Sequence, residues 1–121
     1  MTTREWSFEI VSPAEAGDFI QITFSNDPES TEKYVLLSTQ FEFPQNYDLQ
    51  VETDGGQWYA QLNESKATLT RTTLTIEAVA DHKPVTLVLD FHADEANFNE
   101  LARVAKIMFP CLVCDLSLIH I

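Results

Sequence analysis

The chain has 121 residues, 45% of them hydrophobic, and its 19 acidic and 7 basic residues give a formal net charge of -12. This length suits one domain with a single core. DNA, RNA and anionic lipid are poor direct partners, because their binding depends on Lys and Arg neutralising phosphates. A basic protein is the natural complement of such a chain, although the charge can also serve solubility alone.

The first half of the chain is predicted to be mostly strands, since apolar and polar residues alternate there or form short apolar runs. These segments are residues 6–10, 19–24, 34–37, 47–51 and 58–62. Residues 12–18 and 25–30, together with the Asp54-Gly55-Gly56 triplet, are rich in turn-forming residues and are expected to interrupt the strands. Strands joined this closely are expected to pair as antiparallel hairpins.

Residues 67–91 carry the clearest β pattern. Leu69, residues 74–78 and residues 85–89 alternate between apolar and polar positions, and a turn is expected at residues 80–84.

One helix is predicted after this region, with Asp94 as its N-cap. Its apolar stripe has helical spacing and consists of Phe98, Leu101, Ala102, Ala105 and Met108. Pro110 is expected to stop the helix. The predicted fold is therefore α+β, a β-rich antiparallel sheet or sandwich of about six or seven strands with one C-terminal helix, in a single domain spanning residues 1–109.

The segment 110–121 is expected to be a tail outside this domain. It could add a strand to the sheet, but residues 115–121 also resemble the translation of a sequencing-adapter read-through. Cys111 and Cys114 have the spacing of a zinc or redox pair, yet no second ligand pair accompanies them. We expect no metal and no cofactor. The N-terminus lacks the layout of a signal peptide and no apolar stretch is long enough to cross a bilayer, so we expect a cytoplasmic protein.

The candidate binding surface lies in an acidic stretch that also contains Tyr and Trp. Residues 1–65 hold 12 of the acids but only two basic residues. Acids combined with Tyr and Trp are typical of a patch that binds a basic protein. The alternative for each of the rings Tyr47, Trp58 and Tyr59 is that it fills the core. The residues predicted to bind the partner are Glu42, Tyr47, Asp48, Glu52, Asp54 and Trp58, with Glu29 and Glu32 as secondary candidates.

A second hypothesis places a small-ligand or enzymatic site at Asp90, His92 and Asp94, where two carboxylates flank an imidazole. The motifs of nucleophilic or phosphate-binding enzymes are absent from the sequence. We therefore predict no enzymatic activity. A small acidic adaptor domain is the third hypothesis.

The order of these elements resembles the Immunity protein 10 family of bacterial polymorphic toxin systems. The resemblance covers most of residues 5–109. It rests on residues 34–37 (YVLL), on the LTRTTL segment at 69–74, and on the helix that ends with IMF at 107–109.

The resemblance implies a cytosolic protein without enzymatic activity that binds the C-terminal domain of a cognate toxin and neutralises it. An acidic inhibitor suits a basic toxin, for example a nuclease, because opposite charges accelerate the encounter. The sequence leaves the identity of the toxin and the oligomeric state open.

Overall fold

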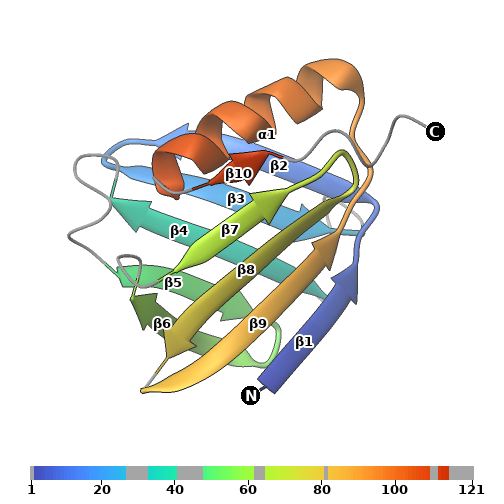
Figure 1. Ribbon diagram of the computed structural model, residues 1–121. Coiled ribbons are helices and arrows are strands. Elements are labelled where there is room, and N and C mark those ends of the chain that lie inside the picture. The colour runs from blue at the N-terminus through green and yellow to red at the C-terminus, as the bar shows by residue number, and fades with distance from the viewer. Residues whose placement is uncertain are drawn as a thin grey trace.

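The computed structural model describes residues 2–26, 33–40, 48–61, 65–80, 82–109 and 112–114. These residues form ten strands and one helix (Figure 1). The strands are β1 Thr2–Ser7, β2 Ile10–Ala16, β3 Phe19–Ser25, β4 Tyr34–Gln40, β5 Asp48–Thr53, β6 Gly56–Gln61, β7 Lys66–Leu69, β8 Thr73–Ala80, β9 Lys83–Asp90 and β10 Val113–Cys114, and the helix is α1 Glu95–Met108.

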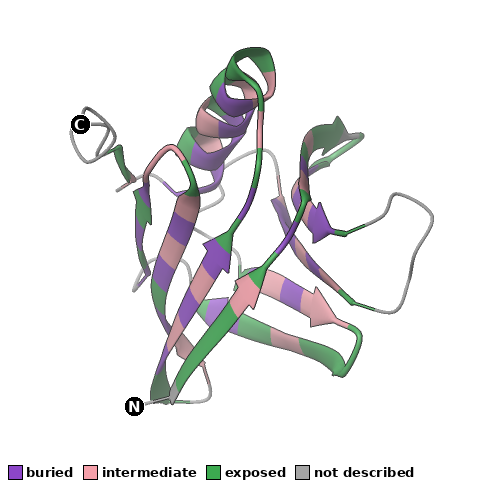
Figure 2. Cartoon of the chain, turned by 90° about the vertical axis from the view of Figure 1, so that its right-hand side faces the viewer, coloured by how far each residue is buried: buried purple, intermediate pink, exposed green. Residues whose placement is uncertain are grey.

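The strands form two five-stranded sheets that face each other across one core. The first sheet has the order β1-β9-β8-β7-β10 and the second has the order β2-β3-β4-β5-β6. Figure 1 shows α1 alongside β2, and the helix also contacts β3. Buried and solvent-facing residues alternate along the strands (Figure 2), as expected for sheets with one face on a core. The one helix in the described part of the chain is not long and apolar enough to span a membrane.

The β-rich character and the single late helix are confirmed, but the predicted number of six or seven strands is wrong. The predicted strand at residues 6–10 is split, because the chain leaves β1 near Phe8 and enters the other sheet at Ile10. Most of the predicted break at 12–18 belongs to β2, where Pro13 pairs with Ile22. This proline is tolerated because β2 is an edge strand, which needs only one set of ladder hydrogen bonds.

The first sheet is mixed, whereas a purely antiparallel arrangement was predicted. β1 pairs parallel to β9, with Trp6 opposite Leu89. β10, from the segment expected to be a tail, pairs parallel to β7. Neither pairing could be predicted from a short stretch of sequence, since parallel neighbours are joined by long connections.

A chain of aromatic rings joins the two sheets at the centre of the core. Phe24 on β3 is fully buried, and its ring centroid lies 6.0 Å from that of Phe8 and 6.1 Å from that of Phe91. Phe8 follows β1 and Phe91 follows β9, so this cluster connects the C-terminal ends of two neighbouring strands of the first sheet to β3 of the second. Aromatic pairs at this spacing contribute attraction beyond their buried area.

The helix begins at the predicted cap. The backbone N–H of Asn97 donates to Asp94 Oδ1 at 2.7 Å, and the buried positions are Phe98, Leu101, Val104, Ala105 and Met108. The stripe differs from the predicted one at two residues, because Val104 is buried and Ala102 is only half-buried.

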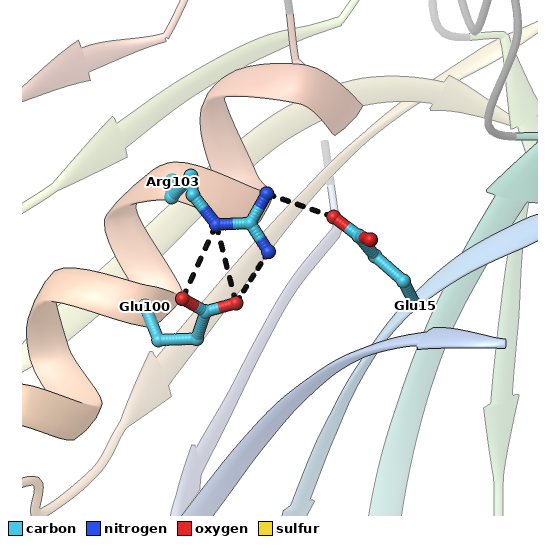
Figure 3. Close-up of polar contacts among 3 residues, drawn as sticks. All are labelled: Glu15, Glu100 and Arg103. Carbon is cyan, nitrogen blue, oxygen red and sulfur yellow. Dashed lines mark hydrogen bonds and ion pairs between the residues drawn. The ribbon is translucent and has the colours of Figure 1, made fainter.

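Side chains also tie α1 to β2. Asn97 Nδ2 donates to the Val11 carbonyl oxygen at 2.8 Å. The Arg103 guanidinium bridges Glu100 on its own helix and Glu15 on β2, the latter at 2.8 Å (Figure 3). The hydrogen bond from Arg103 lowers the pKa of Glu100 below its ordinary value of 4.5. Because the folded-state pKa is the lower one, this contribution to stability is present at neutral pH and is lost as the pH falls through that pKa. These side chains are about half exposed, so their ion pairs contribute little.

Removing the helix cap should lower the free energy of unfolding by a measurable amount. Asp94→Ala leaves the Asn97 N–H without its acceptor, and we expect the free energy of unfolding to fall by about 1 kcal/mol. Urea unfolding followed by circular dichroism measures this change. Asp94→Asn is the matched control, since it keeps an oxygen acceptor. Equal stability of Asp94→Ala and the unmodified protein would contradict the capping role.

Candidate functional site

The candidate site is the outer face of the β2–β6 sheet, defined as the side chains of its strands that point away from the core. Residues opposite each other on neighbouring strands share a face. Leu49 and Val51 of β5 point inward and are fully buried, so Gln50 and Glu52 point outward. On the neighbouring strand β6, Gln57 lies opposite Glu52 and Tyr59 lies opposite Gln50. The outer face also carries Phe19, Gln21 and Thr23 of β3, Tyr34, Leu36, Ser38 and Gln40 of β4, Asp48 of β5 and Gln61 of β6.

This sheet carries no positive charge. Its five strands, as the structure bounds them, contain no Lys, Arg or His, whereas they contain the acids Glu15, Asp48 and Glu52. The basic residues of the described strands lie in the other sheet, at Arg4, Lys66 and Lys83. Glu15 lies opposite the buried Ile20 and pairs with Arg103 of α1, so the acids of the outer face itself are Asp48 and Glu52, and its strands hold no base to neutralise them.

Two exposed aromatic residues border a shallow pocket on this face. Phe19 is 45% exposed and Tyr59 is 53% exposed, and only Val113 joins them as an exposed large hydrophobic residue in the part of the chain that the structure describes. The pocket has a volume of about 200 Å³. It spans four strands and is lined by Phe19, Ser38, Thr39, Gln40, Asp48, Gln50 and Tyr59. Exposed aromatic rings beside polar groups are typical of protein-binding surfaces.

The acidic end of the face is held by local hydrogen bonds. The Tyr34 hydroxyl donates to Glu52 Oε2 at 2.9 Å, which positions this carboxylate over β4 and β5. This hydrogen bond raises the pKa of Tyr34 above its ordinary value of 10.0, because the ionised phenol could no longer donate to a carboxylate.

Asp54 is exposed in the two-residue turn between β5 and β6. Its neighbour Gly55 completes an Asp-Gly pair, which is a favoured sequence for such a turn. The Gly55 N–H donates to Thr53 Oγ1 at 3.1 Å. Gly56 has a φ of 136°, a conformation that residues with a side chain rarely adopt. The turn therefore holds Asp54 beside Glu52 at the edge of the outer face.

The structure brings together only part of the predicted binding set. Asp48 and Glu52 lie on the outer face, and Asp54 lies in the adjoining turn. Trp58 does not share this face, because it lies opposite the buried Val51 and packs against the core. Four predicted residues lie outside the described residues, namely Glu29, Glu32, Glu42 and Tyr47.

Phe19 and Tyr59 take the place of Trp58 as exposed rings on this face, although neither was in the predicted binding set. The signal for Tyr59 was present in the sequence. A two-residue turn at Asp54-Gly55 places position 58 opposite the apolar position 51, and hence turns position 59 outward. The signal for Phe19 was the alternation of residues 19–24, which places its side chain on the solvent-facing side of β3 and not on the buried, apolar side.

In the second predicted site, formed by Asp90, His92 and Asp94, the two carboxylates accept structural hydrogen bonds. Asp90 accepts hydrogen bonds from Thr73 Oγ1 at 2.7 Å and from Ser7 Oγ at 3.4 Å. Asp94 caps α1, and His92 is exposed. Within the described ranges, no group of three or more His, Cys, Asp or Glu side chains is placed to hold a metal ion.

Comparison with known proteins found no matching family model, no similar curated protein and no similar solved structure. The resemblance to the Immunity protein 10 family therefore stays a prediction.

Proposed function

We propose that this protein is an immunity protein that neutralises a cognate bacterial toxin in the cytoplasm by binding it, without catalysis. The binding surface is the outer face of the β2–β6 sheet together with Asp54. The observation that carries the proposal is the pairing of two exposed aromatic rings with carboxylates on a sheet that has no basic residue in its strands. The resemblance on residues 34–37, 69–74 and 107–109 agrees with this function.

The charge of the face favours a basic partner. Asp48, Glu52 and Asp54 follow one another along β5 and its turn, and the net charge of -12 extends the same field around the molecule. Opposite charges on two proteins raise the rate of association and orient the encounter. A toxin domain with a basic surface is such a partner, and rapid capture matters for a protein that must act before the toxin does.

The pocket between Phe19 and Tyr59 suits a cationic side chain of the partner. Aromatic faces attract Lys and Arg, and the attraction strengthens when the cation is desolvated. Asp48 supplies a carboxylate in the same pocket, and Gln40 and Gln50 supply amide oxygens as acceptors. One Arg or Lys inserted here would serve as the central anchor of the interface.

The test is to co-express the protein with the toxin domain encoded next to its gene and to titrate the purified pair. We expect restored growth and a one-to-one complex whose formation fully inhibits the toxin at equimolar amounts. Affinity should fall as salt is added. Inhibition by far less than equimolar protein would indicate a catalytic action and contradict the proposal, as would the absence of any complex.

Truncating one anchor provides a second prediction. Tyr59→Ala removes an exposed ring from the pocket and is expected to weaken toxin binding about tenfold or more, within the range of hot-spot residues. The control is Val113→Ala, which trims another exposed apolar residue on the opposite sheet. Isothermal titration calorimetry compares the two variants. If both variants bound as tightly as the unmodified protein, the pocket would not be the anchor site.

A further inference from the structure

A larger cavity, open to solvent, lies away from the outer face of the β2–β6 sheet. Its volume is about 330 Å³, and it is lined by Arg4, Trp58, Ala80, Lys83, Pro84 and Val85. These residues come from β1, β6 and the β8–β9 hairpin, so the cavity lies where one end of the first sheet meets the edge strand β6 of the second. Trp58 reaches it from the opposite face of β6 to Tyr59. The cavity is therefore separate from the proposed toxin-binding surface.

The walls of this cavity are mostly apolar and continuous with the core. Val85 belongs to the buried core, and Trp58 and Ala80 pack against it. Pro84 is exposed and adds a rigid apolar ring. Cavities of this size with apolar walls and few polar groups are typical of small-molecule sites.

The charged residues that line the cavity are two cations, Arg4 and Lys83. Neither Arg4 nor Lys83 makes an ion pair or a side-chain hydrogen bond with any residue that the structure describes, and both are exposed. Arg103 provides the contrast, because it is paired with two carboxylates. The chain has only seven basic residues, so two at one cavity form a local concentration of positive charge.

The Trp58 side chain also lines this cavity. Its indole N–H is buried and donates to no acceptor within the described part of the chain. A buried donor without an acceptor costs about 1–3 kcal/mol. Because Trp58 lines the cavity, the signal of its indole N–H reports on any ligand that binds there.

We propose that this cavity binds a small amphipathic carboxylate. The carboxylate group lies between Arg4 and Lys83, and the aliphatic body lies against Trp58, Pro84 and Val85. The overall negative charge of the protein opposes any anion, but at physiological ionic strength charges beyond about 8 Å are largely screened. Arg4 and Lys83 are the charged residues that line the cavity, so we expect them to set the charge preference of its ligand.

The probe is octanoate, measured by calorimetry and by the nuclear magnetic resonance signal of the Trp58 indole N–H. Trp6→Phe assigns that signal, because the chain has two tryptophans. We expect saturable one-to-one binding that shifts the Trp58 signal. Octan-1-ol and octylammonium have the same chain without the negative charge and are expected to bind at least tenfold more weakly.

The double variant Arg4→Gln/Lys83→Gln tests the proposed residues. We expect octanoate binding to weaken at least tenfold while the thermal unfolding curve stays unchanged. Lys33→Gln/Lys106→Gln is the matched control, since it removes the same charge from residues that do not line the cavity. Equal binding of octanoate and octan-1-ol, an unaffected Arg4/Lys83 variant or an absence of saturable binding would each overturn the proposal. Toxin neutralisation is measured separately, so this site and the toxin-binding face can fail independently.

Discussion

The double charge reversal Glu52→Lys/Asp54→Lys is expected to weaken toxin binding about 100-fold, which corresponds to about 2.7 kcal/mol. Both carboxylates lie at one end of the outer face, and charge pairs that are close across an interface contribute energies of this order. The reversal also places two cations opposite a basic partner. Calorimetry at several salt concentrations measures the loss, and the salt dependence of the affinity is expected to become flatter.

Two further variants separate local contact from overall charge. Glu5→Lys/Glu9→Lys makes the same change in net charge at exposed positions outside the β2–β6 sheet, and its affinity should stay within a few-fold of that of the unmodified protein. Glu52→Gln/Asp54→Asn removes the charges but keeps an acceptor for the Tyr34 hydroxyl, and an intermediate affinity is expected. If Glu52→Lys/Asp54→Lys and Glu5→Lys/Glu9→Lys weakened binding equally, charge alone would matter and the assigned surface would be wrong.

Replacing Phe24 with Ala is expected to lower the free energy of unfolding by about 3–5 kcal/mol. Phe24 is fully buried, and its ring contacts Phe8 and Phe91, so the substitution leaves a cavity where the two sheets meet. A loss of this size is a large fraction of the 5–15 kcal/mol that is typical of a domain. Urea unfolding followed by both fluorescence and circular dichroism measures the change.

The neighbouring residue supplies the control for this core substitution. Thr23→Ala alters an outward-facing, half-buried position of the same strand and is expected to cost less than about 1 kcal/mol. Similar costs for the two substitutions would show that the aromatic cluster does not join the sheets. Separate unfolding transitions of Phe24→Ala by the two probes would show that the sheets unfold independently in that variant.

The elements with local signals were predictable. The cap at Asp94 was predicted correctly because an acceptor side chain, an acidic first turn and an apolar stripe all lie within 15 residues. β3, β4, β8 and β9 were also predicted close to their observed positions, since each alternates or forms an apolar run. β2 was missed because Pro13 and Gly17 are turn-forming residues, and only the position of β2 at a sheet edge makes the proline acceptable.

The acidic residues of the candidate site could be chosen from the sequence, but its exposed aromatic residues could not. The acids Asp48, Glu52 and Asp54 were identified from composition, and the structure places Asp48 at the start of β5 and the other two at its end and in the adjoining turn. Trp58 was chosen as an anchor in place of Tyr59, although the two-residue turn decides that Trp58 points to the core. The cavity beside Arg4 and Lys83 had no signal, because residues nearly 80 positions apart form it.

The sequence by itself determined the acidic character, the strand-rich content and the capped helix, because charge, alternation and capping depend on residues within a few positions of each other. Only the tertiary structure decided which strands pair in parallel, which ring of the β5–β6 hairpin faces solvent, and where Arg4 and Lys83 meet an apolar cavity. These features depend on burying one shared core between distant segments, and the free energy of that burial depends on the whole chain rather than on any local pattern.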